Sequence, residues 1–514
     1  MTTTDSSSSL VDIIPREVIE SALSLLDWKS LIQCRQVCAT FRALIDSSAQ
    51  LQYNIELGIA HMEDGPPSCV ESAARLKMLR LYQSNWANMR WQRDVRIPME
   101  DGGLWELYGN VLAQKLADNS YKFICLRSCS REIKQREWTL GPVDVDARDF
   151  GLDESQDLFV PVAKLPSSNE PLSEPSAAAT TEFQVHLKSL TTGKPHPLAP
   201  NSGVLAFTKV GRDLPVSLTI QISGTQLAIL FHSLAEDAEN ELVIWNWHTG
   251  ERQSLIGDSM RAFSFLGDHY VVMVLMQDDP VEEDVRPVMN VWDTHSAANG
   301  DAVRVDEANF TRSFRFPTLS NRAHLTEITI RSDPAPQWSP SSETQAPFYL
   351  ARSAKLYVVT FWVIVGNNSR GISVFIPAAT LLNRVTSADA ATVVDWENWG
   401  PRGSLLLKSW IHPGSVWVCY VYGEKYVSFL PAGANSQSVI VFDFNEAAAL
   451  RSGPMPEQPS VYKEKNIFEE QVVTNIPYRA TLCRIQSGPA HGMCSEDAIL
   501  LVDPGHRFYR VLSF

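Results

Sequence analysis

The residues of this chain that could do chemistry are scattered, and no catalytic motif brings them together. The patterns G-x-S-x-G, H-E-x-x-H, G-x-G-x-x-G and G-x-x-x-x-G-K-[ST], which mark nucleophiles, zinc sites and phosphate-binding loops, do not occur. Gly193-Lys194 lacks the upstream glycine of a phosphate-binding loop and is predicted to form a turn. His491 and Cys494 lie beside glycine and proline, which indicates a loop rather than a metal site. The sequence therefore predicts a binding protein with no catalytic residue, no cofactor and no metal ion.

The eight cysteines predict reduced thiols rather than disulfides or a zinc site. Cys34 and Cys38 are four residues apart, as are Cys125 and Cys129, and no neighbouring histidine or cysteine completes a tetrahedral set. Buried free thiols are typical of proteins in reducing compartments. The N-terminal stretch MTTTDSSSSL has neither the basic nor the apolar region of a secretory signal. Together these features predict a protein of the cytoplasm, the nucleus or both.

Charged residues form two local concentrations. The acidic run from Asp278 to Asp284 is predicted to be an exposed loop, which is either simply solvated or receives a basic ligand segment. The net charge of −15 argues against nucleic acid or an anionic membrane as a partner. The second concentration is a group of arginines that either frame a phosphate or acidic peptide or are scattered over the surface: Arg304, Arg312, Arg315, Arg322 and Arg331.

Residues 11–62 have the period of amphipathic helices. Pro15 suits the first turn of a helix, because its missing N–H would be unbonded there, and Asp27 is a good N-cap for a helix beginning at Trp28. Apolar residues recur at helical spacing as far as Ile45 and cover more than one face. A unit of about 40 residues barely offsets its conformational entropy with the apolar area that it can bury alone. The pattern predicts either a helical cap packed on the main body or a module whose second apolar face docks on a partner.

The order of residues in this part resembles an F-box. The register of that motif is followed by Ile14-Pro15-x-Glu17-Val18, by Leu26-Asp27-x-x-Ser30-Leu31, and by Arg35-x-Val37-Cys38-x-x-Phe41-Arg42-x-Leu44-Ile45. Ile14 replaces the usual leucine, and Ala39 replaces a frequent basic residue. The segments that follow also resemble those of large fungal F-box proteins. The resemblance implies a non-catalytic subunit of an SCF (Skp–cullin–F-box) ubiquitin ligase.

The resemblance further implies that the apolar residues of this module bind the Skp adaptor. Through the adaptor the chain would reach a cullin and its RING partner, while the target protein stays unknown. Some of these residues must instead form the internal core of the module, and the sequence does not divide the two sets. The residues expected to dock on the adaptor are Ile14, Pro15, Val18, Ile19, Leu23, Leu26, Leu31, Val37, Cys38 and Phe41.

The chain changes character after this module. Residues 1–10 are predicted to be a disordered tail, and residues 63–100 a helical linker. From residue 101 to residue 514, short apolar runs alternate with Gly, Pro, Asp and Asn, which is typical of an all-β domain. The most apolar run, Leu356–Val365, has about half of the roughly 20 residues needed to cross a bilayer, so a buried strand is predicted.

A degenerate repeat runs through the β region. The step from Val243 to Asn290 is 47 residues, close to the roughly 40–45 residues of a WD-type propeller blade. Trp245 and the pair Trp292-Asp293 resemble the end of a blade's third strand in WD-repeat proteins. The pattern predicts about seven blades, with six or eight as alternatives and a pair of β-sandwiches as the alternative fold. The predicted blades lie near residues 104–140, 145–198, 203–256, 258–303, 320–385, 402–452 and 476–514.

These features together predict an α+β multidomain protein, with a three-helix F-box and a helical linker before a β-propeller-like domain. The expected function is that of a substrate receptor, in which the F-box binds the adaptor and the propeller binds a target protein. One alternative is a propeller scaffold whose F-box does not direct ubiquitination. An enzyme housed in the β body is a third reading, against which the missing motifs argue.

Overall fold

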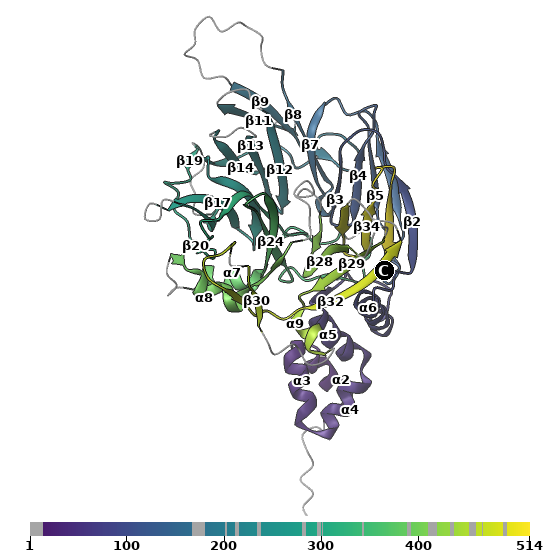
Figure 1. Ribbon diagram of the computed structural model, residues 1–514. Helices are drawn as coiled ribbons and strands as arrows, with labels where there is room; N and C mark the ends of the chain where they lie inside the picture. The colour runs from purple at the N-terminus through teal and green to yellow at the C-terminus, as the bar shows by residue number, and fades with distance from the viewer. Residues whose placement is uncertain are drawn as a thin grey trace, which may run out of the picture.

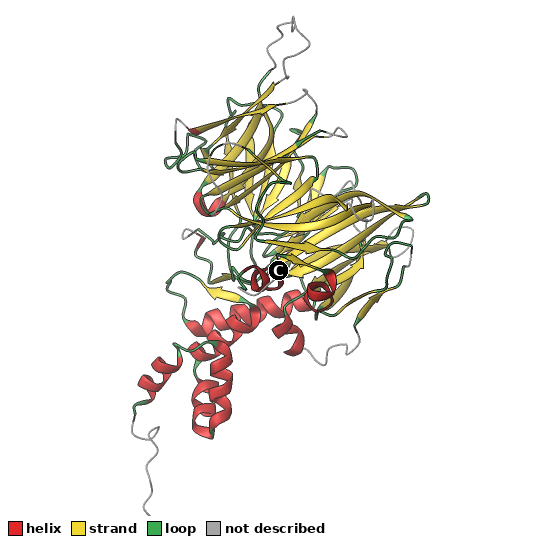
Figure 2. Ribbon diagram, turned by 90° about the vertical axis from the view of Figure 1, so that its left-hand side faces the viewer, coloured by secondary structure: helices red, strands yellow, loops and turns green. Residues whose placement is uncertain are grey.

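The computed structural model consists of helices gathered at one end of a ring of β-sheets (Figure 1). The helices lie on one face of the ring, as the turned view shows (Figure 2). Among the described residues, no helix is both long and apolar enough to cross a membrane. The predicted tail (residues 1–10) and most of the acidic run lie outside the described residues, which are 14–166, 180–200, 203–210, 215–233, 238–279, 284–295, 300, 302–341, 344–387, 392–409, 419–431, 436–451, 459–464, 466–486 and 491–514.

The first part of the chain forms the predicted helices and two short strands. Helices α2 to α5 are called the helical module below, and α6 connects this module to the sheets. The elements are α2 (Arg16–Leu23), α3 (Trp28–Val37), α4 (Ala39–Ser47), α5 (Ala49–Ala60), β1 (Met62–Asp64), α6 (Ser72–Ala87) and β2 (Arg93–Pro98).

The described strands form seven blades around a common axis, so the propeller prediction is confirmed and the β-sandwich alternative is wrong. Each blade is named here after its first strand. The β3 blade contains β3 (Trp105–Tyr108), β4 (Val111–Lys115), β5 (Tyr121–Cys125) and β6 (Arg136–Leu140); the β7 blade contains β7 (Ala147–Asp153), β8 (Leu158–Lys164), β9 (Thr180–His186), β10 (Lys188–Ser189) and β11 (Val204–Val210); the β12 blade contains β12 (Val216–Ser223), β13 (Gln226–Ser233), β14 (Asn240–Asn246), β15 (Arg252–Gly257) and β19 (Val303–Arg304).

The remaining blades carry the additional helices of the propeller. Helices α7 (Ala378–Val385) and α8 (Trp396–Gly403) follow β24, and α9 (Glu446–Arg451) follows β29. The β16 blade contains β16 (Met260–Leu266), β17 (Tyr270–Asp279), β18 (Asp284–Asp293), β20 (Arg312–Arg315) and β25 (Val393–Val394); the β21 blade contains β21 (Ala323–Arg331), β23 (Leu356–Val365), β24 (Asn368–Pro377) and β26 (Leu405–Lys408); the β27 blade contains β27 (Val421–Tyr422), β28 (Lys425–Pro431), β29 (Ser436–Asp443) and β32 (Arg479–Gln486); the β33 blade contains β33 (His491–Cys494), β34 (Ala498–Val502), β35 (Phe508–Ser513) and β2.

Strand β2 closes the ring. It pairs antiparallel with β35, from Arg93 opposite Ser513 to Pro98 opposite Phe508, and is the outermost strand of the β33 blade. The sequence predicted a helical linker over this range, and the alternation of RDVRIP is too short to predict a strand without its partner. Residues 203–210 likewise differ from the predicted boundary, because β11 completes the β7 blade instead of beginning the next one.

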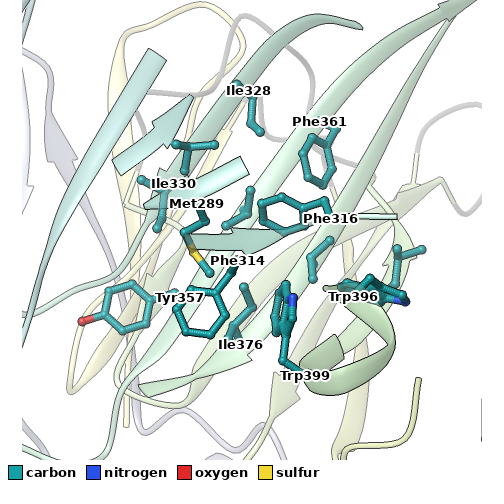
Figure 3. Packing of buried hydrophobic residues seen from close by; sticks show 14 of the residues in the cluster. Met289, Phe314, Phe316, Ile328, Ile330, Tyr357, Phe361, Ile376, Trp396 and Trp399 are labelled. Carbon is teal, nitrogen blue, oxygen red and sulfur yellow. The ribbon is translucent and has the colours of Figure 1, made fainter. Parts of the chain in front are cut away.

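The core of the propeller lies between the blades. An apolar cluster fills each of the seven contacts between neighbouring blades, as expected for sheets that bury both faces. The largest cluster joins the β16 and β21 blades, where Phe314 and Phe316 pack against Phe361 and Trp399 (Figure 3). The indole N–H of Trp399 donates to the Arg315 carbonyl at 2.9 Å, so its polar edge is satisfied within the cluster.

Two further β ladders lie outside the blades. Strand β22 (Phe348–Leu350) belongs to the long connection between β21 and β23, and it pairs antiparallel with β1 of the N-terminal part. Strands β30 (Ser460–Tyr462) and β31 (Val472–Thr474) form a small ladder beside the β21 blade. The β1–β22 pair is the first of several contacts that join the helical part to the propeller.

Candidate functional site

The helical module has a small apolar core of its own. Leu31 and Ile45 are fully buried, and Leu23, Leu44, Leu51 and Ile55 complete the cluster. The helices meet closely because Gly58 of α5 has no side chain at the point where the Trp28 ring of α3 lies against it. A Cβ at this position would lie 2.0 Å from Trp28 Cδ1.

Local hydrogen bonds fix where the helices of the module begin. The Asp27 carboxylate accepts from the backbone N–H groups of Lys29 and Ser30 at 2.9 and 3.1 Å, as an N-cap of α3 does. Cys38 takes the same position before α4, where its Sγ accepts from the Phe41 N–H at 3.4 Å. The predicted cap at Asp27 is therefore present. The exposed Cys38 also has a structural role, because its thiol caps α4.

The structure divides the ten predicted docking residues by burial. Leu23 and Leu31 are buried in the core of the module, and Ile19 and Phe41 are half-buried against it. The other six side chains remain exposed: Ile14, Pro15, Val18, Leu26, Val37 and Cys38.

Exposed apolar side chains are concentrated on this module. Val18 is 55% exposed and Val37 is 69% exposed, and Leu25, which the motif did not single out, is 87% exposed. Large apolar residues exposed to this degree on neighbouring helices are typical of a surface that a partner covers. Leu25 lies in the turn between α2 and α3, where the helical period gives no signal, so the sequence pattern did not identify it.

Helix α5 belongs to two cores at once. Leu51 and Ile55 point into the helical module, whereas Tyr53 and Leu57 belong to the apolar cluster between the β27 and β33 blades. The Tyr53 hydroxyl donates to the Pro347 carbonyl at 2.9 Å, which ties α5 to the connection that carries β22. Because one rigid helix contributes to both cores, the module has a fixed orientation on the propeller.

Charged residues strengthen this connection. The buried Glu56 of α5 binds Arg451 of α9 at 2.5 Å and Arg80 of α6 at 3.2 Å. His61, in the left-handed conformation just after α5, lies 2.8 Å from Glu424, and this hydrogen bond raises the pKa of His61 although burial opposes the rise. The helical module thus reaches the propeller through ion pairs as well as apolar contacts.

Helix α6 lies across the β33 blade. The Trp86 ring stacks on Phe514 with 4.1 Å between ring centroids, and the Tyr82 hydroxyl donates to the Glu496 carbonyl at 2.7 Å. Beneath this contact the Arg131 guanidinium binds the carboxylates of Glu496, at 2.9 Å, and of Asp497. All three charged side chains are at most 3% exposed, so the joint between helices and propeller contains a fully buried ion triad.

A cavity of about 150 Å³ lies in the centre of the propeller. The first strands of five blades line it, and its acidic lining residues include Glu106, Asp149 and Asp333. Burial raises the pKa of Glu106 to about 8, helped by the charge of Asp149, whose own pKa burial raises to about 6. Arg331 on the same wall opposes both shifts. The cavity is therefore acidic, and a bound cation would stabilise the ionised carboxylates.

The cavity lies in the central channel of the propeller. One end of this channel is covered by the connection between β21 and β23, here called the crossing segment (residues 332–341 and 344–355). Gln337 packs on the β12–β13 turn at Gly224 and donates from Nε2 to the Asp268 carbonyl of the β16–β17 turn at 2.7 Å. Trp338 lies against Gly109 of the β3–β4 turn, on the opposite side of the axis. The same segment carries β22, so the covered mouth is the one that faces the helices.

The arginines that the sequence grouped together do not converge. Arg304 and Arg315 line a hollow of about 940 Å³ between the β12 and β16 blades, but Arg304 is paired with Glu239 and Asp306, and Arg315 with Asp395. Arg312 donates instead to backbone carbonyls. The hypothesis of a shared phosphate site is therefore not supported: Arg304 and Arg315 form surface ion pairs, whereas Arg331 lines the central cavity.

Comparison with known proteins agrees with the two-part architecture. The family model of the F-box domain matches residues 12–52. The chain thus carries an F-box domain, followed by the seven-bladed β-propeller described above. An F-box domain implies binding of a Skp1-like adaptor. No curated protein matches the sequence.

Two solved structures are similar to this chain at low sequence identity. The WD40 domain of SCAP from fission yeast matches with 7% identity and a TM-score of 0.33, over 82% of this chain and 98% of that domain. Hsv2 of Kluyveromyces lactis matches with 10% identity and a TM-score of 0.26, over 76% of this chain and 99% of that protein. The number and order of the blades given above come from the strand pairing of this chain itself.

Proposed function

We propose that this chain is the substrate-recognition subunit of an SCF-type ubiquitin ligase. The observation that carries the proposal is an F-box module with a closed core and a group of exposed apolar side chains, which is joined to a propeller by a shared helix. In this role the chain catalyses nothing itself. It holds an acceptor lysine of the target near the ubiquitin-charged enzyme and so raises its effective concentration.

The adaptor would bind the exposed part of the module. Val18, Leu26 and Val37 would make the central apolar contacts, with Ile14, Pro15 and Cys38 beside them and Leu25 as an additional contact. Leu23 and Leu31 would support the surface from within, because neither has area left for a partner. Ile19 and Phe41, which are half-buried, would contribute to both.

The target would bind the face of the ring opposite the helices. On that side the channel is not covered by the crossing segment, and the carboxylates of Glu106 and Asp149 lie within it. A lysine or arginine side chain of the target is the ligand that fits an acidic cavity of this size. The distance between the two binding faces would be constant, because α5 fixes the module on the propeller.

Capture of the Skp adaptor by the full-length chain tests the proposal. A charged residue at position 18 would have to be desolvated in an apolar interface, so Val18→Asp is expected to weaken adaptor binding at least about tenfold, or about 1.4 kcal/mol. Leu198→Asp is the matched control, because Leu198 is 57% exposed, close to the 55% of Val18, and belongs to the propeller. Circular dichroism of each variant would establish that the fold is retained.

The outcomes separate the possible functions. Equal capture by the parent chain and Val18→Asp would refute the docking surface, and a parent chain that captures no adaptor would refute the proposed function. A chain that captures the adaptor but recruits no cullin would instead be the propeller scaffold. Proximity labelling with the ligase blocked would then identify the target, whose binding should decrease when Glu106 and Asp149 are changed to Gln and Asn.

A further inference from the structure

Three possible metal ligands meet at one corner of the β16 blade. His269 lies in the turn between β16 and β17, and Asp293 and His295 lie at the end of β18. The β17–β18 register, which places Tyr270 opposite Asp293, brings together side chains that are 24 residues apart in the sequence. One ligand atom from each residue lies within 4.8 Å of the others.

Hydrogen bonds hold the backbone at this corner. Thr294 donates to the His269 carbonyl from both its N–H, at 2.9 Å, and its hydroxyl, at 2.8 Å. Gln226 of the neighbouring blade donates in turn to the Thr294 hydroxyl at 2.6 Å. Asp293 Oδ1 accepts from the His295 N–H at 2.9 Å, which positions the carboxylate beside the imidazole. Such outer contacts orient the ligands of protein metal sites.

The two imidazole rings already lie face to face. The centroids of His269 and His295 are 4.6 Å apart, and the ring planes are inclined by 8°. Imidazole nitrogens are among the commonest ligands of zinc in proteins. His295 is exposed, whereas His269 is partly buried.

We propose that His269, Asp293 and His295 form a binding site for a zinc-type divalent ion. Imidazole nitrogen and carboxylate oxygen bind zinc at about 2.0–2.2 Å, which places neighbouring ligands of a tetrahedral ion about 3.4 Å apart. The three ligand atoms lie within 4.8 Å of one another, so a small adjustment of the exposed His295 side chain would bring them to this spacing. The three protein ligands leave the fourth position to water, and the single carboxylate offsets one of the two positive charges.

The location of the site gives the ion a structural role. The turn that carries His269 also carries Asp268, whose carbonyl accepts from Gln337 of the crossing segment. A bound ion would connect this turn to the chain that leaves β18, and so would strengthen the support of the segment that covers the channel mouth. The inference does not depend on the proposed ligase function, because it rests on residues of the propeller alone.

Zinc titration of the untagged full-length chain, measured by isothermal calorimetry, tests the site. His269→Ala, Asp293→Asn and His295→Ala are each expected to weaken Zn²⁺ binding at least about tenfold, because removal of a ligand costs at least as much as removal of an outer contact. His324→Ala is the matched control, since His324 is an exposed histidine of the next blade, and it should leave the affinity unchanged. Asn at position 293 keeps the acceptor for the His295 N–H.

Cobalt substitution distinguishes this site from the cysteines of the chain. Co²⁺ bound by nitrogen and oxygen alone shows visible bands without the near-ultraviolet absorption of a cobalt–thiolate bond, and these bands should disappear in His295→Ala. Because His295 is exposed, this variant should retain the circular dichroism of the parent. A parent chain that binds no Zn²⁺ at micromolar concentration, or three variants that bind it as the parent does, would overturn the proposal.

Discussion

The buried ion triad at the joint between helices and propeller makes a strong prediction about stability. The Arg131 guanidinium donates to Asp497 Oδ1 at 3.0 Å and to the Phe348 carbonyl at 2.9 Å, and it is paired with Glu496 at 2.9 Å. Replacement of Arg131 by Met keeps most of the side-chain volume but removes the only positive charge in this triad. Two carboxylates would then lie close together in a site without access to water.

The size of the effect follows from that burial. Removal of one partner from a buried ion pair costs about 3–5 kcal/mol, since the remaining charge stays desolvated. With about 2.1 cal/mol/K per residue, unfolding of 514 residues has an entropy of about 1.1 kcal/mol/K, so the midpoint of thermal unfolding should fall by about 3–5 °C. The surface pair of Arg304 with Glu239 and Asp306 provides the control, because Arg304→Met removes only a solvent-screened pair and should lower the midpoint less than Arg131→Met does.

The loss of stability caused by Arg131→Met should become smaller as the pH falls. Burial raises the pKa of Glu496 even in the parent chain, against the opposing effect of Arg131, and loss of that arginine should raise it further. A folded state with a raised carboxyl pKa binds more protons than the unfolded state, so stability increases as the pH falls toward the unfolded pKa. Differential scanning calorimetry at several pH values measures both effects. A midpoint lowered no more than in Arg304→Met, or a deficit that grows as the pH falls, would refute the reasoning.

Three further variants test other parts of the structure. Gly58→Ala should destabilise the F-box module by about 1–3 kcal/mol, because its Cβ would overlap the Trp28 ring, and a gain in stability by chemical denaturation would contradict this packing. Glu106→Gln should flatten the pH dependence of the unfolding midpoint. Burial raises the pKa of Glu106 from 4.5 to about 8, so the parent protein should lose stability as the pH rises through this interval. The variant should lose less stability over the same interval. Gly224→Ala should loosen the crossing segment, because Gly224 has a φ of +56° and its Cβ would meet Gln337; hydrogen exchange of residues 335–341 should become faster, and unchanged exchange would argue against the contact.

Much of the fold could be predicted from local patterns. The cap at Asp27, the strand Leu356–Val365 and the third-strand positions of Trp245 and Trp292 are confirmed, because each depends on residues close in sequence. Strand β2 could not be predicted, because a six-residue edge strand is specified by its partner β35, which lies at the other end of the sequence.

The candidate sites show the same division. The F-box motif identified the apolar residues of the module, but only the packing of α2 to α5 separates the buried Leu31 from the exposed Val37. The acidic cavity was not predicted, because Glu106, Asp149 and Asp333 are each unremarkable in sequence and meet only when the ring closes. The cluster of His269, Asp293 and His295 likewise depends on the register of the β17–β18 hairpin, which the spacing of these residues in the sequence does not reveal.

The closure of the ring has a consequence for folding during translation. The ion pair between Asp94 of β2 and Arg510 of β35 joins residues that are 416 positions apart. At about 5–20 residues per second, β2 leaves the ribosome roughly 20–80 seconds before its partner exists. During that interval helix α6 lacks Phe514 and the carbonyl of Glu496, on which it rests in the finished protein. The N-terminal helices are made first but complete their contacts last, because these contacts form only after the final blade has emerged.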